Sequence, residues 1–169
     1  MTPTDPAAEP AKSYRLITSF GDSRVAIDEV IATAQSTLSI FDPTLERLGF
    51  GDPQRIARVR AFLLAGRAHR LRIALHDPTY VERHGARLLA LLRELPAAIA
   101  IHRTTGEALK AVDPFVLADD HSVWHQFHVE QPRASVSLHA PDDAKPMVDR
   151  FESIWELSEQ AISSAPPMV

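Results

Sequence analysis

The sequence predicts an α/β protein with a mixed, mostly parallel β-sheet and helices on both faces. Over residues 14–102, short apolar runs alternate with longer segments whose apolar residues recur at helical spacing. From residue 115, three strand-like runs follow one another with little room for helices, and a helical segment closes the chain. Strands that alternate with helices favour a parallel sheet packed between layers of helices.

The first predicted strand covers residues 14–20, and Gly21-Asp22-Ser23 opens a helix that runs to Gln35, with Ser23 as its cap. A short buried strand follows at residues 37–41. Asp52 and then Pro53 form an N-cap followed by proline at the first helical position, which predicts a second helix ending near Gly66.

The third and fourth strands are predicted at residues 70–76 and 98–102. Between them, Asp77 and Pro78 repeat the capping signal and predict a helix to Leu95, where Pro96 stops it. Three further strands are predicted at 115–118, 122–127 and 135–139, and a last helix is predicted over 142–162.

Composition limits the classes of protein that the chain can represent. Its 169 residues, 45% of them hydrophobic, suffice for one domain, which we place at residues 14–162 between tails at 1–13 and 163–169. The absence of cysteine excludes disulfides, thiolate nucleophiles and Cys-ligated zinc. No apolar run approaches the ~20 residues of a membrane helix, and the start lacks the apolar core of a signal peptide, so we expect a cytoplasmic protein.

The stretch from Leu109 to Leu157 resembles the end of one half of a phospholipase D-like enzyme. A strand closes at Asp119, more strands follow, and the last helix carries Phe151 and Trp155. The resemblance implies that superfamily's fold. It also implies a pattern H-x-K-x-x-x-x-D, in which the His attacks phosphorus, the Lys binds the phosphate, and two halves meet to form one metal-independent site.

The catalytic pair of that pattern is absent. Counting back from Asp119, the Lys position is Pro114 and the His position is Val112. Neither side chain can act as nucleophile or phosphate clamp. We therefore assign no catalytic residue and expect an inactive phospholipase D-like domain that serves as a binding or assembly module.

The same resemblance implies a homodimer, because active relatives with a single half pair with a second copy. Trp124 is either an anchor of that dimer or buried within the monomer. We expect no cofactor, and the further partner is either another protein or a small anionic ligand.

Five polar residues follow the predicted strands at their carboxyl ends: Asp42, His76, Asp77, His102 and Arg103. If those strands are parallel neighbours, these residues approach one rim, where ligands of α/β sheets tend to bind. The alternative function is thus an enzyme or anion-binding protein that uses this rim on a phosphorylated or carboxylated ligand. The competing interpretation is structural, with Asp77 as a helix cap and Asp42 as a turn residue.

Asp119, His121 and His125, with His128 nearby, form the densest cluster of potential metal ligands. On a strand, His121 and His125 point to one face while His128 points away, so the three rings do not converge without a bulge. We therefore expect no metal site and interpret these histidines as exposed or interface groups.

Arginines crowd one segment and leave a nucleic-acid accessory role as a second alternative. They are Arg55, Arg58, Arg60, Arg67, Arg70 and Arg72. The formal net charge of -4 gives no global basic field, and the segment lacks aromatic stacking partners because Phe62 belongs to its core stripe. We expect a solvated helix face and no nucleic-acid binding.

Overall fold

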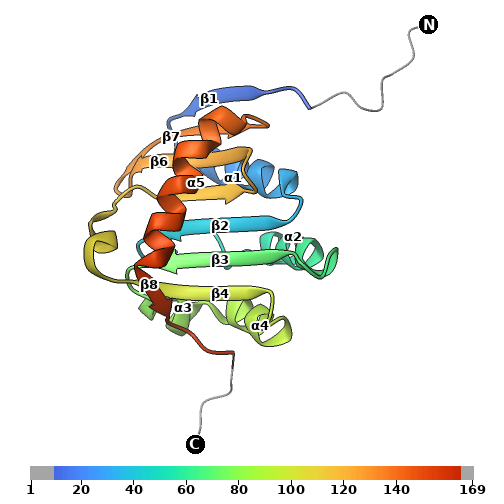
Figure 1. The fold of residues 1–169 in the computed structure, drawn as a ribbon, viewed down its shortest axis with the longest axis vertical. Coiled ribbons are helices and arrows are strands. Elements are labelled where there is room, and N and C mark those ends of the chain that lie inside the picture. Colours follow the sequence, from blue (N-terminus) through green and yellow to red (C-terminus); the bar gives the residue numbers. More distant parts are fainter. Residues whose placement is uncertain (1–9, 165–169) are drawn as a thin grey trace, which may run out of the picture.

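The computed structural model describes residues 10–164, which form one eight-stranded sheet with helices on both faces (Figure 1). The strands are β1 (Ser13–Ile17), β2 (Thr37–Asp42), β3 (Arg70–Leu75), β4 (Ile99–Thr104), β5 (Phe115–Ala118), β6 (Ser122–His128), β7 (Gln131–Leu138) and β8 (Ser158–Gln160). The helices are α1 (Phe20–Thr33), α2 (Pro53–Leu64), α3 (Thr79–His84), α4 (Ala86–Glu94) and α5 (Pro141–Glu156), with a 3-10 turn, η1, at Gly106–Lys110.

The strand order is β1-β7-β6-β5-β2-β3-β4-β8. Only β2 with β3 and β3 with β4 pair in parallel, whereas every other neighbouring pair is antiparallel. The sheet is therefore mixed but mostly antiparallel, and the prediction of a mostly parallel sheet is wrong. The alternation of strand and helix holds from β2 to β4, where helical crossovers allow parallel pairing, but β1 leaves this series and pairs with β7.

The sheet lies between two apolar cores, one on each face. Helices α1 to α4 cover one face and α5 crosses the other, as Figure 1 shows, so the prediction of helices on both faces is confirmed. Ile40 belongs to the core on the side of α1 to α4, and its neighbour Phe41 packs with Phe151 of α5 in the other. Adjacent residues of β2 thus serve opposite layers, because successive strand residues point to opposite faces.

Helix α1 begins one turn earlier than predicted. Its N-cap is Ser19, whose Oγ accepts a hydrogen bond from the backbone N–H of Asp22 at 3.1 Å. Ser23, predicted as the cap, lies inside the helix and accepts a 3.0 Å hydrogen bond from Nε1 of Trp124. Trp124 is 1% exposed, so this indole is buried within the monomer.

The cap at the start of α2 is confirmed, since Asp52 Oδ1 accepts from the N–H of Gln54 at 2.9 Å. The helix predicted from Asp77 to Leu95 is instead two helices, α3 and α4, that meet at Gly85. A Cβ atom at Gly85 would lie 2.5 Å from the carbonyl oxygen of Val81. Only glycine allows the chain to approach itself so closely at this break.

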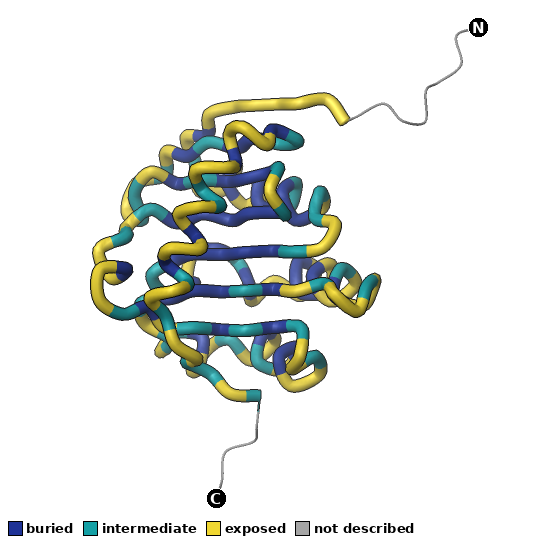
Figure 2. Tube along the Cα trace, in the orientation of Figure 1, coloured by how far each residue is buried: buried dark blue, intermediate teal, exposed yellow. Residues whose placement is uncertain are grey.

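The closing helix ends at Glu156, earlier than predicted, and the chain continues into β8, which pairs antiparallel with β4. Most of both predicted tails, residues 1–9 and 165–169, lies outside the described residues. Within the described part of the chain, no helix has the length and apolar character needed to cross a membrane. Strand β1 forms one edge of the sheet and is exposed for most of its length (Figure 2).

Candidate functional site

The segment that holds Val112 and Pro114 extends the pairing of β5 with β6. The carbonyl of Val112 accepts from the N–H of Val129 at 2.8 Å, and that of Pro114 accepts from the N–H of Gln126 at 2.9 Å. Val112 is exposed, whereas Pro114 is buried. The segment therefore lies in the sheet but offers neither a nucleophile nor a positive charge.

Asp119 stands in the turn after β5, and its carboxylate binds the start of β2. It accepts hydrogen bonds from the backbone N–H groups of Gln35 at 2.6 Å, Ser36 at 2.9 Å and Thr37 at 2.8 Å. Burial acts to raise the pKa of Asp119, but these hydrogen bonds outweigh it and hold the pKa below its usual range. The residue is engaged inside the fold and serves as an anchor between strands.

The three residues considered as metal ligands separate into two pairs. His121 Nε2 lies 3.3 Å from Asp119 Oδ2, whereas His125 Nε2 lies 2.8 Å from Asp113 Oδ2. His128 uses Nδ1 to accept from the N–H of Glu130 at 3.1 Å. Across residues 10–164, no group of three or more His, Asp or Glu side chains could hold a metal ion.

His125, Asp113 and Arg150 form a charged cluster on the α5 face of the sheet. Asp113 precedes β5, His125 lies on β6 opposite Phe115, and Arg150 of α5 donates to Asp113 Oδ1. Burial opposes ionisation of Asp113, yet the hydrogen bond from His125 and the charge of Arg150 outweigh it and lower the pKa of the carboxyl. Since an ionised carboxylate only accepts, Nε2 of His125 is the donor in this hydrogen bond.

Sequence reasoning missed Asp113 and Arg150 in this cluster. One signal for Asp113 was available, because an extended chain alternates its faces and Asp113 lies between Val112 and Pro114. Asp113 contacts α5, so Val112 and Pro114 are directed to the opposite side of the sheet. No local pattern pointed to Arg150, since its contact depends on how α5 crosses the strands.

The rim at the carboxyl ends of β2, β3 and β4 exists, because these strands are parallel neighbours with Asp42, Leu75 and Arg103 in one row. Asp42 turns into the loop after β2, where Oδ2 accepts from the N–H of Thr44 at 3.0 Å. Burial raises the pKa of Asp42, and the backbone hydrogen bonds from Thr44 and Leu45 oppose that rise only in part.

Asp77 and Arg103 have separate partners. Asp77 Oδ1 accepts from the hydroxyl of Thr79 at 2.6 Å and from its N–H at 2.9 Å, which lowers the pKa of Asp77 and closes the turn into α3. Arg103 lies 3.5 Å from the carboxylate of Glu159 on β8. The N-cap of α3 is Pro78 and not Asp77 as predicted, so Asp77 acts one residue earlier, in the turn that leads into the helix.

The two rim histidines are held by contacts within the protein. His76 places Nδ1 2.5 Å from the Thr104 hydroxyl and Nε2 2.6 Å from the carbonyl of Ala111. His102 stacks on Trp155 with ring centroids 3.7 Å apart. Within residues 10–164, no hydrogen bond or ion pair joins any two of the five predicted rim residues, although the charge of His76 acts on Asp42 and that of Arg103 acts on Asp77.

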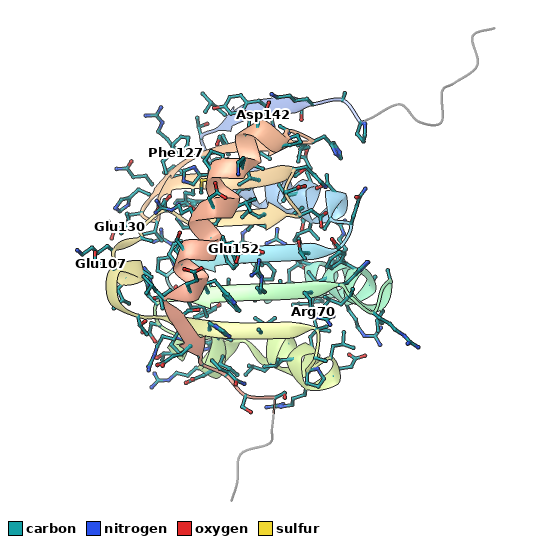
Figure 3. The ribbon with its side chains drawn as sticks, viewed as in Figure 1. Arg70, Glu107, Phe127, Glu130, Asp142 and Glu152 are labelled. Atoms are coloured by element: carbon teal, nitrogen blue, oxygen red, sulfur yellow. The ribbon has the colours of Figure 1, made fainter. Side chains whose placement is uncertain are left out.

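The crowded arginines are largely paired with carboxylates. Arg60 lies 2.5 Å from Glu94, and Arg72 lies 2.6 Å from Glu152, which Figure 3 labels on α5 above the middle of the sheet. Arg55 is 4% exposed and binds Asp28, which also lies 3.9 Å from Arg58. This segment is thus not a free basic surface.

Comparison with known proteins identifies the fold. A family model described as "Domain of unknown function (DUF7931)" matches residues 21–163. No curated protein matches the chain. Among solved structures, the phospholipase D family member Nuc from Salmonella typhimurium has a TM-score of 0.63 at 13% identity, with 90% of this chain and 100% of that chain covered.

Two further structures give the same result. NucT from Helicobacter pylori has a TM-score of 0.57 at 10% identity, with 89% of this chain and 100% of that chain covered. The archaeal chromatin protein TrmBL2, described as showing a novel mode of DNA binding, has a TM-score of 0.62 at 13% identity, with 94% of this chain and 56% of that chain covered. At such identities the likeness concerns the fold, which is phospholipase D-like, as the resemblance implied.

Proposed function

Since this chain belongs to the DUF7931 family and has a phospholipase D-like fold, we propose that it is a catalytically inactive member of that fold that serves as a binding or assembly module. The observation that carries the proposal is the pair Val112 and Pro114, which stand at the positions of the nucleophile and the phosphate clamp. Neither an isopropyl group nor a pyrrolidine ring can attack phosphorus or bind an anion.

The surroundings of the pair support this proposal. Pro114 is buried, so the position of the clamp is closed within the protein. Asp119, the one matching residue of the pattern, is engaged with the start of β2. His125 does not replace the missing nucleophile, because it lies with Asp113 on the opposite face of the sheet.

A homodimer is part of the proposal. Nuc and NucT are covered over their whole length by this chain, so they too correspond to one half-domain each. Val112 itself is exposed, and Phe20 of α1 is a second exposed apolar side chain. Arg47 lies over the Phe20 ring at 5.4 Å and donates to the carbonyl of Val129 at 3.0 Å, joining these parts of the surface. An apolar surface of this kind suits a protein partner better than a phosphate.

Two measurements test the proposal. With bis-p-nitrophenyl phosphate in the presence of EDTA, we expect no turnover above buffer. Light scattering should give twice the 18.7 kDa of one chain, and Val112→Asp should shift the mass to that of a monomer. Val25→Asp is the matched control, because Val25 is an exposed valine on α1. Metal-independent turnover would refute the proposed inactivity. A monomer in the unmodified protein would refute the proposed homodimer.

A nucleic-acid role is the second candidate, because TrmBL2 is described as binding DNA and shares the fold. The ion pairs of Arg55, Arg60 and Arg72 argue against the arginine segment as the binding surface. Fluorescence anisotropy with a short DNA duplex at increasing salt distinguishes the two candidates. Binding that weakens steeply with salt would favour phosphate contacts and the second candidate.

A further inference from the structure

A cleft of about 480 Å³ lies on the α5 face of the sheet, between the first half of α5 and strands β1, β6 and β7. Asp143, Pro146 and Met147 of α5 form one wall, and side chains of the three strands form the rest. Figure 3 labels Asp142 at the end of α5 that lies over this part of the sheet. The volume falls in the range of sites for small molecules, roughly 300–1,000 Å³.

Two serines of β7 line this cleft without a protein partner. Ser137 is 3% exposed, and Ser135 lies two residues away on the same face of the strand. Among the hydrogen bonds of residues 10–164, none uses either hydroxyl. Because no buried side-chain polar atom of the described residues lacks a partner, both hydroxyls open onto the cleft, where they can accept a hydrogen bond from a molecule that enters it.

His125 lines the same cleft directly across from Ser135 in the register of β6 and β7. Its Nε2 is bound to Asp113, which Arg150 holds in turn. The ring is therefore fixed in orientation, and its Nδ1 faces no partner among the hydrogen bonds of residues 10–164, so it can bond to a ligand group.

Opposite charges stand at the other end of the cleft. Lys12 precedes β1, whose residue Ser13 pairs with Leu138 at the end of β7, and Asp143 lies in the first turn of α5, which follows β7. Neither Lys12 nor Asp143 has an ion pair within residues 10–164. A ligand that carries both an anion and a cation on neighbouring atoms would satisfy both groups.

We propose that this cleft binds an α-amino acid with a long polar side chain. Its carboxylate contacts Lys12 and its ammonium contacts Asp143, while its aliphatic stem packs on Met147. The end of the side chain supplies the N–H or O–H donor that Ser137 and His125 can accept. The proposal rests on this face alone and holds whether or not the chain forms a homodimer.

The test is a thermal-shift panel of free amino acids, each compared with its N-acetyl and its amide derivative. We expect stabilisation by an amino acid with a polar side chain and its loss with both derivatives, because each derivative removes one charge. Titration should then show affinity weakened about 10-fold or more by Lys12→Met and by Asp143→Asn, and about 5-fold by Ser137→Ala, as expected for a lost charge pair and a lost hydrogen bond.

Lys145→Met and Asp149→Asn are the matched controls. They make the same chemical changes on α5, but these residues pair with each other at 3.4 Å and do not line the cleft. Perturbation of the His125 ring signals by the amino acid, measured by NMR on the unmodified protein, tests the site without any variant. Equal stabilisation by the N-acetyl derivative, or no effect of any amino acid on the protein, would overturn the proposal.

Discussion

Asp119 and Thr37 hold each other through two reciprocal hydrogen bonds. The N–H of Thr37 donates to Asp119 Oδ1 at 2.8 Å, and the N–H of Asp119 donates to the carbonyl of Thr37 at 2.9 Å. The pairing of Leu38 with Ala118 begins directly beside them, so these bonds set the register of β2 against β5. The one matching residue of the catalytic pattern therefore has a structural role in this protein.

Removal of the Asp119 carboxylate should destabilise the fold. Asp119→Ala removes charge-assisted hydrogen bonds to three backbone N–H groups and leaves a non-glycine residue at φ 52° without its stabilising contacts, so we expect a loss of about 2–4 kcal/mol. Asp119→Asn should lose less, because asparagine tolerates this conformation and its amide oxygen still accepts. Urea unfolding measures both. Asp120→Ala, at the exposed next position, is the control and should leave stability unchanged.

Stability should fall in acid because the pKa values of Asp113 and Asp119 are lowered in the folded state. A carboxyl with a depressed folded pKa contributes stability above its unfolded pKa, about 3.9, and loses it as pH falls through the folded value. The free energy of unfolding should therefore decrease from about pH 5 downward. Urea titrations at a series of pH values should show that the free energy of unfolding of Asp119→Asn decreases less steeply in acid than that of the parent protein. The same decrease in both proteins would contradict a contribution from the lowered pKa of Asp119.

His102 should add a second pH dependence, at higher pH. Burial, and then the charge of Arg72, lowers the pKa of His102 in the folded state. The unfolded chain therefore binds a proton first as pH falls below about 6.5, and stability decreases from there to the folded pKa. His102→Phe preserves a ring to stack on Trp155 and removes the titration. Between these two pKa values, the free energy of unfolding of the variant should change less with pH than that of the parent protein. The same dependence on pH in both proteins would refute the prediction.

The hydrogen bond from Trp124 to Ser23 connects β6 to α1 inside the core. Trp124→Phe leaves the Ser23 hydroxyl without its partner and removes part of a fully buried ring, so a loss of about 1–3 kcal/mol is expected. Ser23→Ala tests the other partner. In the double-mutant cycle a coupling of about 1 kcal/mol would support the bond, whereas additive losses would show that the ring matters only by its volume.

Arg55 should be essential to the fold. It is 4% exposed and donates to Asp28 and to the carbonyl oxygens of Leu48 and Arg24. Arg55→Met leaves these acceptors unpaired, and we expect a loss of about 3–5 kcal/mol in urea unfolding. Arg60→Met, which breaks an ion pair at the surface, should change stability little. Equal effects of the two substitutions would show that Arg55 is not an internal link between helices.

Local elements followed closely from local patterns. Residues 115–118 were predicted as a strand and form β5, and the Asp52 cap is present as expected. These features depend on side chains a few residues apart, where spacing and capping chemistry are visible in the sequence. The break at Gly85 and the strand β8 were missed because each depends on contacts with another segment.

The candidate site shows the same division. The sequence drew attention to His125 and Asp119 by residue type, but it did not pair His125 with Asp113 or place Ser137 in a cleft. Those relations depend on the register of β5, β6 and β7 and on the position of α5. A shift of one residue in any strand would move every side chain to the opposite face.

By itself, the sequence determined most of the local elements, the α/β class with helices on both faces, and the absence of His and Lys at positions 112 and 114. All of these follow from side-chain chemistry and from periodicity over a few residues. Only the tertiary structure decided that the sheet is mostly antiparallel and that Asp119 holds Thr37. It also decided which unpaired polar side chains meet under α5. The physical reason is that strand pairing and register arise from hydrogen bonds between residues far apart in the chain, and local periodicity does not encode those partners.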